Sequence, residues 1–219
     1  MKFIKEYLNA SPYIGVFAVA TETHSLFPEF ITQKQKAYYQ DILGTEIIQT
    51  TLAGSHLLGV LAVGIQDKFL VSNLISDKEL AFFKNQGLQV QVLENNLAIG
   101  NLIALNENGA VCSPMFSDEE IKKIKSFLGI EVNTTKIGGN DLAGSSCRAT
   151  NTGFVVHPNA LDSELVVVQK TLKVEGIRTT ANYGDKYVAN ALVANSQGAI
   201  VGIPTTTHEM IRIDEALRK

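Results

Sequence analysis

The side chains of this sequence that could carry chemistry are its two cysteines and four histidines. Cys112 lies beside Val111 in an apolar run, and Cys147 lies in a second short run, so buried hydrophobic roles are favoured over nucleophilic ones. The histidines lack the spacing of a zinc site, because His208 has no second histidine one helical turn away. We therefore expect no metal site, no cofactor and no enzymatic activity.

Four glutamates invite an acid–base interpretation, but they recur at equivalent positions of a repeated pattern: Glu79, Glu120, Glu164 and Glu209. Ser76, Ser117 and Thr206 precede three of them by three residues, which is the spacing of a helix capping box. For the fourth, Asp162 is the predicted cap. Helix capping therefore explains these carboxylates, and paired general acids are not expected.

The chain has 219 residues, of which 45% are apolar and 19% are charged, and its net charge is −3. This composition predicts a globular protein and excludes a positive field strong enough to hold a polyanion by itself. Unpaired cysteine spacing, a charged N-terminus and the lack of a long apolar run favour a cytoplasmic protein with no membrane contact.

The sequence contains five copies of one β/α unit, with anchors at positions 15, 59, 100, 144 and 189. Each anchor opens a short apolar run that predicts a buried strand, followed by a tight turn such as Asn106-Glu107-Asn108-Gly109, where Asn and Gly tolerate positive φ. A second strand, an amphipathic helix and a third strand complete the unit. The first copy is the weakest, with Gln35 at the start of the helical stripe, although Tyr38 and Ile42 continue it.

Closure follows from the two ends of this pattern. The fifth copy reaches Lys219 without its third strand, whereas the chain begins with an unpaired apolar segment at Phe3. We expect residues 1–219 to form a single domain, a ring in which the N-terminal strand completes the last unit and the termini meet. An open solenoid with capping repeats is the alternative.

A ring of five such units resembles the pentein fold, a five-bladed α/β propeller with five-fold pseudosymmetry. Seven segments in a fixed order carry a closer resemblance: Pro12-Tyr13-Ile14-Gly15-Val16-Phe17-Ala18, Leu52-Ala53-Gly54-Ser55, Leu97-Ala98-Ile99-Gly100-Asn101, Asn108-Gly109-Ala110-Val111-Cys112-Ser113-Pro114, Thr150-Asn151-Thr152-Gly153, His157-Pro158, and Ala194-Asn195-Ser196-Gln197-Gly198-Ala199-Ile200-Val201-Gly202 before Thr205-Thr206. In these segments, and over nearly the whole chain, the sequence is similar to the translation initiation factor 6 family, particularly its archaeal branch.

This resemblance implies a monomeric protein that binds the large ribosomal subunit and sterically blocks joining of the small subunit, with roles in initiation and large-subunit biogenesis. It implies docking on ribosomal protein uL14 near the sarcin-ricin loop, with minor rRNA contact. The residues that it places on the ribosome-facing surface are Ser55, His56, Val60, Asn101, Asn106 and Glu107.

Two alternatives stay open. The first is a guanidine-modifying enzyme, because a second family with the pentein fold consists of such enzymes. They use a nucleophilic cysteine late in the chain, whereas no cysteine follows Cys147 in this sequence. A protein-binding ring with another partner is the second alternative.

Overall fold

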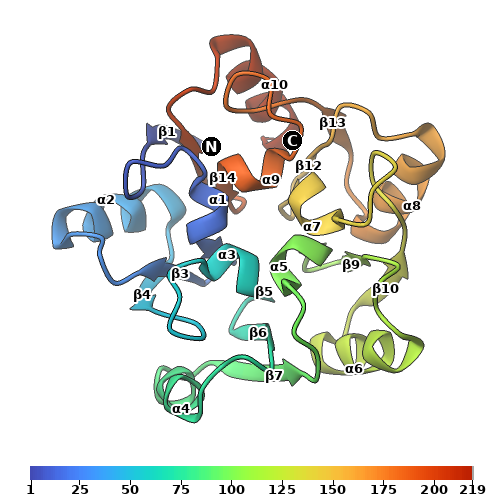
Figure 1. Cartoon of the computed structure of the whole chain (residues 1–219). Coiled ribbons are helices and arrows are strands. Elements are labelled where there is room, and N and C mark those ends of the chain that lie inside the picture. The colour runs from blue at the N-terminus through green and yellow to red at the C-terminus, as the bar shows by residue number, and fades with distance from the viewer. Residues whose placement is uncertain (219) are drawn as a thin grey trace.

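The computed structural model describes residues 1–218, which form five three-stranded sheets arranged around one centre (Figure 1). Lys219, where the fifth unit was expected to stop, lies outside the described residues. Each sheet has the same order. An inner strand pairs antiparallel with a middle strand, and the middle strand pairs parallel with an outer strand. This arrangement is the pentein fold predicted from the sequence.

The sheets use three sets of strands. The inner strands, which contact one another around the centre, are β2 (Val19–Ala20), β5 (Ala62–Ile65), β8 (Ile103–Asn106), β11 (Cys147–Ala149) and β14 (Leu192–Ala194). The middle strands are β3 (His24–Pro28), β6 (Lys68–Ser72), β9 (Gly109–Cys112), β12 (Phe154–Val156) and β15 (Gly198–Gly202). The outer strands are β4 (Glu46–Thr50), β7 (Gln89–Leu93), β10 (Glu131–Thr134), β13 (Gly176–Arg178) and β1 (Lys2–Glu6).

Helices occur in two sets. One helix of 9 or 11 residues follows each middle strand, and these are α2 (Gln33–Leu43), α4 (Asp77–Asn85), α6 (Asp118–Leu128), α8 (Asp162–Leu172) and α10 (Thr207–Leu217). The first four lead to the parallel outer strand of their own blade, whereas the outer strand of the fifth blade is β1, at the start of the chain. One short helix precedes each inner strand, and these are α1 (Ile14–Phe17), α3 (Leu58–Leu61), α5 (Ile99–Leu102), α7 (Ala143–Ser146) and α9 (Val188–Ala191). Among the described residues, every helix is too short or too polar to cross a lipid bilayer.

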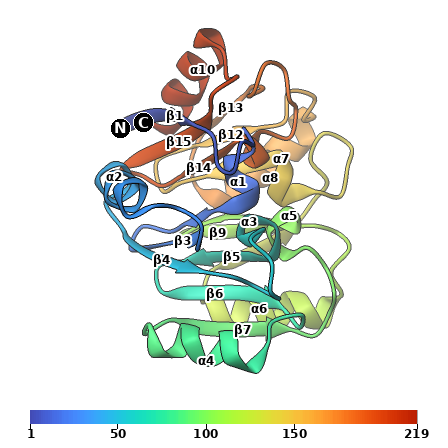
Figure 2. The same cartoon turned by 60° about the vertical axis from the view of Figure 1, so that its left-hand side comes forward.

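The ring closes through the N-terminal strand, as predicted. β1 pairs in parallel with β15, in a register that places Phe3 opposite Ala199, and Figure 2 shows β1 beside β15. Phe3 also packs against the apolar cluster that contains Ile213 and Leu217 of α10. The first strand of the chain therefore supplies the third strand of the fifth blade, and the open solenoid is excluded.

The hydrophobic core consists of clusters that each lie between two neighbouring blades. One cluster joins Val19 and Leu26 of the first blade to Phe69 and Phe83 of the second. The cluster that closes the circle joins Val193 and Ile200 of the fifth blade to Phe27 and Tyr39 of the first. Because each blade buries apolar surface against both neighbours, the ring is stabilised as a unit rather than blade by blade.

Three local predictions are wrong. The anchors at 15, 59, 100, 144 and 189 lie on the short helices, and the inner strands begin three or four residues later. Asp162 is the first residue of α8 and not its cap, because the helix begins after Leu161. In the first blade Tyr39, which is fully buried, takes the place predicted for Tyr38, which is 49% exposed, whereas Ile42 is buried as predicted. Gln35 there completes a capping box with Thr32, so it occupies the position of the glutamates in the other blades.

Candidate functional site

The short helices form a closed ring around the molecular axis, and we call this side of the molecule the helix-ring end (Figure 1). Their anchor residues approach one another unusually closely. A Cβ on Gly15 would lie 1.9 Å from the carbonyl oxygen of Ala189, and one on Gly59 would lie 1.8 Å from that of Gly15. Gly100 and Gly144 continue the series in the same way. Glycine is therefore needed at these four anchors because backbone meets backbone, whereas the fifth anchor is Ala189.

Four of the six predicted site residues lie at the helix-ring end. Ser55 and His56 lie in the loop before α3, Val60 lies on α3, and Asn101 lies on α5. His56 is exposed, whereas Ser55, Val60 and Asn101 are partly buried. The Ser55 hydroxyl accepts a hydrogen bond from the Leu57 N–H at 3.2 Å, which shapes this loop. The side-chain amide of Asn101 makes no hydrogen bond to any residue that the structure describes, so it is free to meet a partner.

The other two predicted residues, Asn106 and Glu107, lie at the far end of strand β8, in the turn that joins β8 to β9. We call this side of the molecule the hairpin end. Asn106 is 4% exposed, and its Nδ2 donates to the carbonyl oxygens of Thr150 and Leu172, both at 2.9 Å. Asn106 and Glu107 are therefore separated from Asn101 by the length of a strand, and the six residues do not form one surface.

The hairpin turns also differ from expectation in their backbone. No residue of the turn from Asn106 to Gly109 has a positive φ. In the described part of the chain, Gln66 is the one residue with positive φ that lies in a turn between an inner and a middle strand. Gly109 is required for another reason, since a Cβ there would lie 2.1 Å from the carbonyl oxygen of Thr171. Close packing of the turn on the next blade, rather than turn chemistry, explains this glycine.

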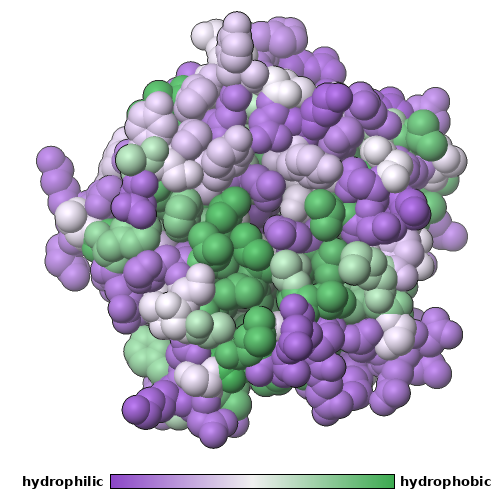
Figure 3. All heavy atoms as spheres, viewed as in Figure 1, coloured by the Kyte–Doolittle hydropathy of each residue, from purple (hydrophilic) through white to green (hydrophobic). Residues whose placement is uncertain are grey.

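The helix-ring end carries an exposed apolar surface that the sequence did not reveal. Leu57 is 39% exposed, Tyr13 39% and Phe30 38%. The ring of Phe30 packs edge-on against His56, with centroids 5.2 Å apart, and against Phe17 at 6.1 Å. Figure 3 shows hydrophobic residues gathered near the centre of this side, over α3 and its neighbours, with hydrophilic residues around them. An apolar patch with a polar rim is typical of a protein–protein interface.

The loops that lead to the helix-ring end are held by the capping glutamates. Besides capping α4, Glu79 accepts hydrogen bonds from the Ala53 N–H at 3.1 Å, the Gly54 N–H at 3.0 Å and the Thr51 hydroxyl at 2.9 Å. Burial alone would raise the pKa of Glu79, but N–H donors from Gly54 and Ser76 outweigh it and lower the pKa to about 2. This carboxylate is therefore charged at neutral pH and fixes the loop that carries Ser55 and His56.

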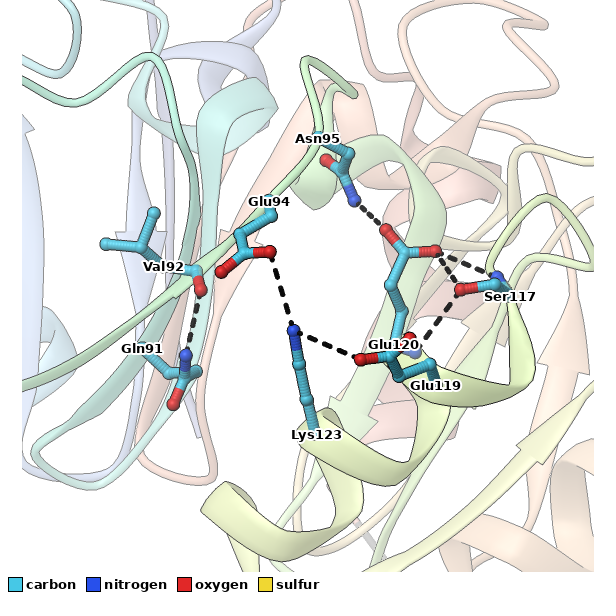
Figure 4. Close-up of polar contacts among 8 residues, drawn as sticks. All are labelled: Gln91, Val92, Glu94, Asn95, Ser117, Glu119, Glu120 and Lys123. Carbon is cyan, nitrogen blue, oxygen red and sulfur yellow. Dashed lines mark hydrogen bonds and ion pairs between the residues drawn. The ribbon is translucent and has the colours of Figure 1, made fainter.

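The same arrangement recurs in other blades. Glu164 accepts from the Gly138 and Gly139 N–H groups at 2.7 and 3.1 Å, and Glu209 accepts from the Gly184 N–H at 2.8 Å. In the third blade, Glu120 caps α6 at Ser117 and accepts from the Asn95 side chain, while Lys123 reaches Glu94 at 3.7 Å (Figure 4). Each of these glutamates therefore joins a helix start to the loop before a short helix, which the interpretation as capping alone missed.

Neither cysteine is placed for nucleophilic chemistry. Cys112 and Cys147 are free and buried, and burial raises the pKa of each thiol to about 12. Within residues 1–218, no group of three or more His, Cys, Asp or Glu side chains is arranged to hold a metal ion. The surface at the helix-ring end carries an apolar patch with polar neighbours.

Comparison of the sequence with known proteins identifies the family. The model of the eIF-6 family matches residues 4–216 of the chain. The chain belongs to the eIF-6 family. Members named Translation initiation factor 6 are 36% identical to it in Pyrococcus abyssi, over 94% of both chains, and 36% identical in Methanocaldococcus jannaschii, over 98% of this chain and 97% of the relative. The Saccharolobus islandicus relative is 34% identical over 93% of both chains.

Among solved structures, the chain is similar to the N-terminal domain of ArgZ, an arginine dihydrolase from cyanobacteria, in its substrate-bound C264S form. The TM-score is 0.51 at 12% sequence identity, and the match covers 82% of this chain and 80% of that domain. At this identity the similarity concerns the fold alone. It gives no reason to expect the chemistry of ArgZ in this chain.

Proposed function

We propose that this protein acts in translation initiation by binding the large ribosomal subunit and keeping the small subunit from joining it. Membership of the eIF-6 family, whose model matches residues 4–216, is the observation that carries this proposal. Its relatives are named Translation initiation factor 6, which supports a binding factor rather than an enzyme. A cytoplasmic location and a part in large-subunit biogenesis belong to the same proposal.

The helix-ring end is the surface proposed to dock. It brings together His56, Val60 and Asn101 with the exposed apolar side chain of Leu57. Its loops are fixed by the glutamate hydrogen bonds, so little conformational entropy is lost when a partner binds. The hairpin end has a different character, because Asn106 there is buried and occupied by internal hydrogen bonds.

A protein surface of the ribosome is the favoured partner, with uL14 near the sarcin-ricin loop as the proposed site. The net charge of −3 provides no broad positive field for rRNA, so RNA contacts would be local. An apolar patch of this kind is suited to packing against apolar protein side chains. Occupation of the intersubunit face would then exclude the small subunit by steric overlap, without a chemical step.

Sedimentation with purified ribosomal subunits tests the proposal. The protein should pellet with salt-washed archaeal large subunits at a saturable ratio of about one to one, and should stay in the supernatant with small subunits. Added before the subunits are mixed, it should also reduce the yield of joined ribosomes in proportion to the bound fraction. A folded protein that does not sediment with clean large subunits would contradict the proposal.

A further inference from the structure

A partly open cavity lies on the axis of the ring, lined by the inner strands β2, β5, β8, β11 and β14 and by the hairpin turns that follow them. Its volume is about 40 Å³, which is enough for roughly three water-sized particles at about 10–15 Å³ each. Most of its wall is apolar or backbone, with polar side chains toward the hairpin end. A space of this size accepts water or a small ion.

One side chain in this wall breaks the pattern of the repeat. Arg148 of β11 lines the cavity, whereas the equivalent residues of the other inner strands are Val19, Val63, Ala104 and Val193. The repeat itself therefore does not require a charge at this position. A cation in a short apolar strand is costly, and its presence calls for a compensating group.

Within residues 1–218 that compensation is incomplete. The Nη2 atom of Arg148 donates to the carbonyl oxygen of Ala189 at a long 3.3 Å, and its Nε is sealed from solvent without a hydrogen-bond partner. The guanidinium belongs to none of the ion pairs among these residues. Burial lowers the pKa of Arg148 to about 10, so the group keeps its charge at neutral pH.

The surroundings restrict which anion could supply the missing charge. The adjacent Cys147 thiol is neutral, because burial raises its pKa to about 12. Glu22 and Glu107 line the cavity at the hairpin end, and Glu22 is held there by the Ser196 hydroxyl at 2.7 Å. These carboxylates repel multivalent anions such as phosphate and sulfate more strongly than a single negative charge.

From these observations we propose that the central cavity binds one small monovalent anion, chloride in solution, against the guanidinium of Arg148. The anion supplies the acceptor that Nε lacks and neutralises a charge held between the fourth and fifth blades. Because the cavity touches all five inner strands, its occupation stabilises the closed ring. The lining of this site shares no residue with the exposed apolar patch of Tyr13, Phe30 and Leu57.

Thermal unfolding of the full-length protein tests the proposal in solution. Titrating sodium chloride into sodium gluconate at constant ionic strength should raise the Tm along a saturable curve, by about 2–4 °C. Bromide should replace chloride, and sulfate should not. The rise should be lost in Arg148→Met and kept in Arg212→Met, whose guanidinium donates to the Arg178 carbonyl oxygen outside the cavity.

Crystals of the wild-type protein grown or soaked in bromide give a second readout that does not depend on whether Arg148→Met folds. An anomalous peak within hydrogen-bonding distance of the Arg148 guanidinium is the expected result. Ordered water alone in the cavity, or a Tm that is the same in chloride and gluconate, would overturn the proposal.

Discussion

The Nδ2 atom of Asn195 donates to the carbonyl oxygen of Leu43 at 2.7 Å, which connects the hairpin turn of the fifth blade to the end of helix α2 in the first. In the same way, Asn106 of the third blade donates to the carbonyl oxygen of Leu172 in the fourth. The Thr152 hydroxyl of the fourth blade donates to the carbonyl oxygen of Leu217 in the fifth, at 2.6 Å. The last carbonyl groups of a helix lack partners within the helix. Hairpin turns of this ring therefore cap the C-terminus of the next blade's helix.

Replacing Asn195 with alanine should consequently destabilise the protein although the residue lies in a turn. The change removes donors to Thr21 and Leu43 and an acceptor for the Gly198 N–H, all in a buried setting. We expect a loss of about 2–3 kcal/mol in the free energy of unfolding, measured by urea denaturation. Asn85→Ala, at an exposed helix end, is the control and should stay within about 0.5 kcal/mol. Equal effects of the two changes would show that the Asn195 hydrogen bonds contribute little.

The anchors give a second prediction, because their spacing depends on the absence of a side chain. Gly59→Ala places a Cβ 1.8 Å from the Gly15 carbonyl oxygen. Neighbouring short helices must then move apart, which should cost about 1–3 kcal/mol or more. Ala189→Gly is the matched control on the same ring and should cost about 1 kcal/mol or less, through backbone entropy. Comparable chemical-denaturation midpoints for the two variants would contradict this explanation of the anchor glycines.

The repeat and its closure were predictable from the sequence because they depend on apolar positions and on a strand present at one end and lacking at the other. The anchor strands were misassigned because a helix of four residues is too short to produce a periodic pattern. The role of Asn106 was missed for a different reason: its acceptor, Leu172, is distant in sequence and belongs to another blade. Contacts between blades depend on how neighbouring blades pack against each other, and the sequence of one repeat does not reveal that packing.

Acid should loosen the helix-ring end through Glu79. Its pKa is about 2 in the folded protein and higher in the unfolded chain, at about 4.3. Because the folded value is the lower one, the stabilisation is fully present above about pH 4.5 and is lost as the pH falls toward 2. Glu79→Gln should therefore flatten the pH dependence of stability in that range, measured by urea unfolding at pH 2.5–7. Asp77→Asn, at the exposed start of the same helix, is the control. A curve for Glu79→Gln that keeps the wild-type slope would argue against this linkage.

Both thiols should be inert in the native protein. Burial raises the pKa of Cys112 and Cys147 to about 12, so the thiolate fraction at neutral pH is negligible. In a dithionitrobenzoate assay at pH 7.5, neither should react at the rate of a free thiol until the chain is unfolded in urea. Rapid reaction of one cysteine in the folded state would revive the interpretation of that residue as a nucleophile.

The division of the predicted site residues between two ends allows the docking surface to be located by paired variants. Leu57→Asp introduces a charge into the apolar patch and Asn101→Ala removes an unbonded amide on the neighbouring helix α5, whereas Glu107→Ala changes the hairpin end. If the helix-ring end docks, Leu57→Asp should weaken binding to large subunits by more than about tenfold, which corresponds to about 1.4 kcal/mol. Asn101→Ala should weaken it less, and Glu107→Ala should bind as the wild type does, in sedimentation titrations at one salt concentration. All three variants should keep the wild-type Tm, because none removes a fully buried side chain or a side-chain hydrogen bond within the protein. This separates lost recognition from lost folding. Weaker binding by Glu107→Ala alone would instead place the docking surface at the hairpin end.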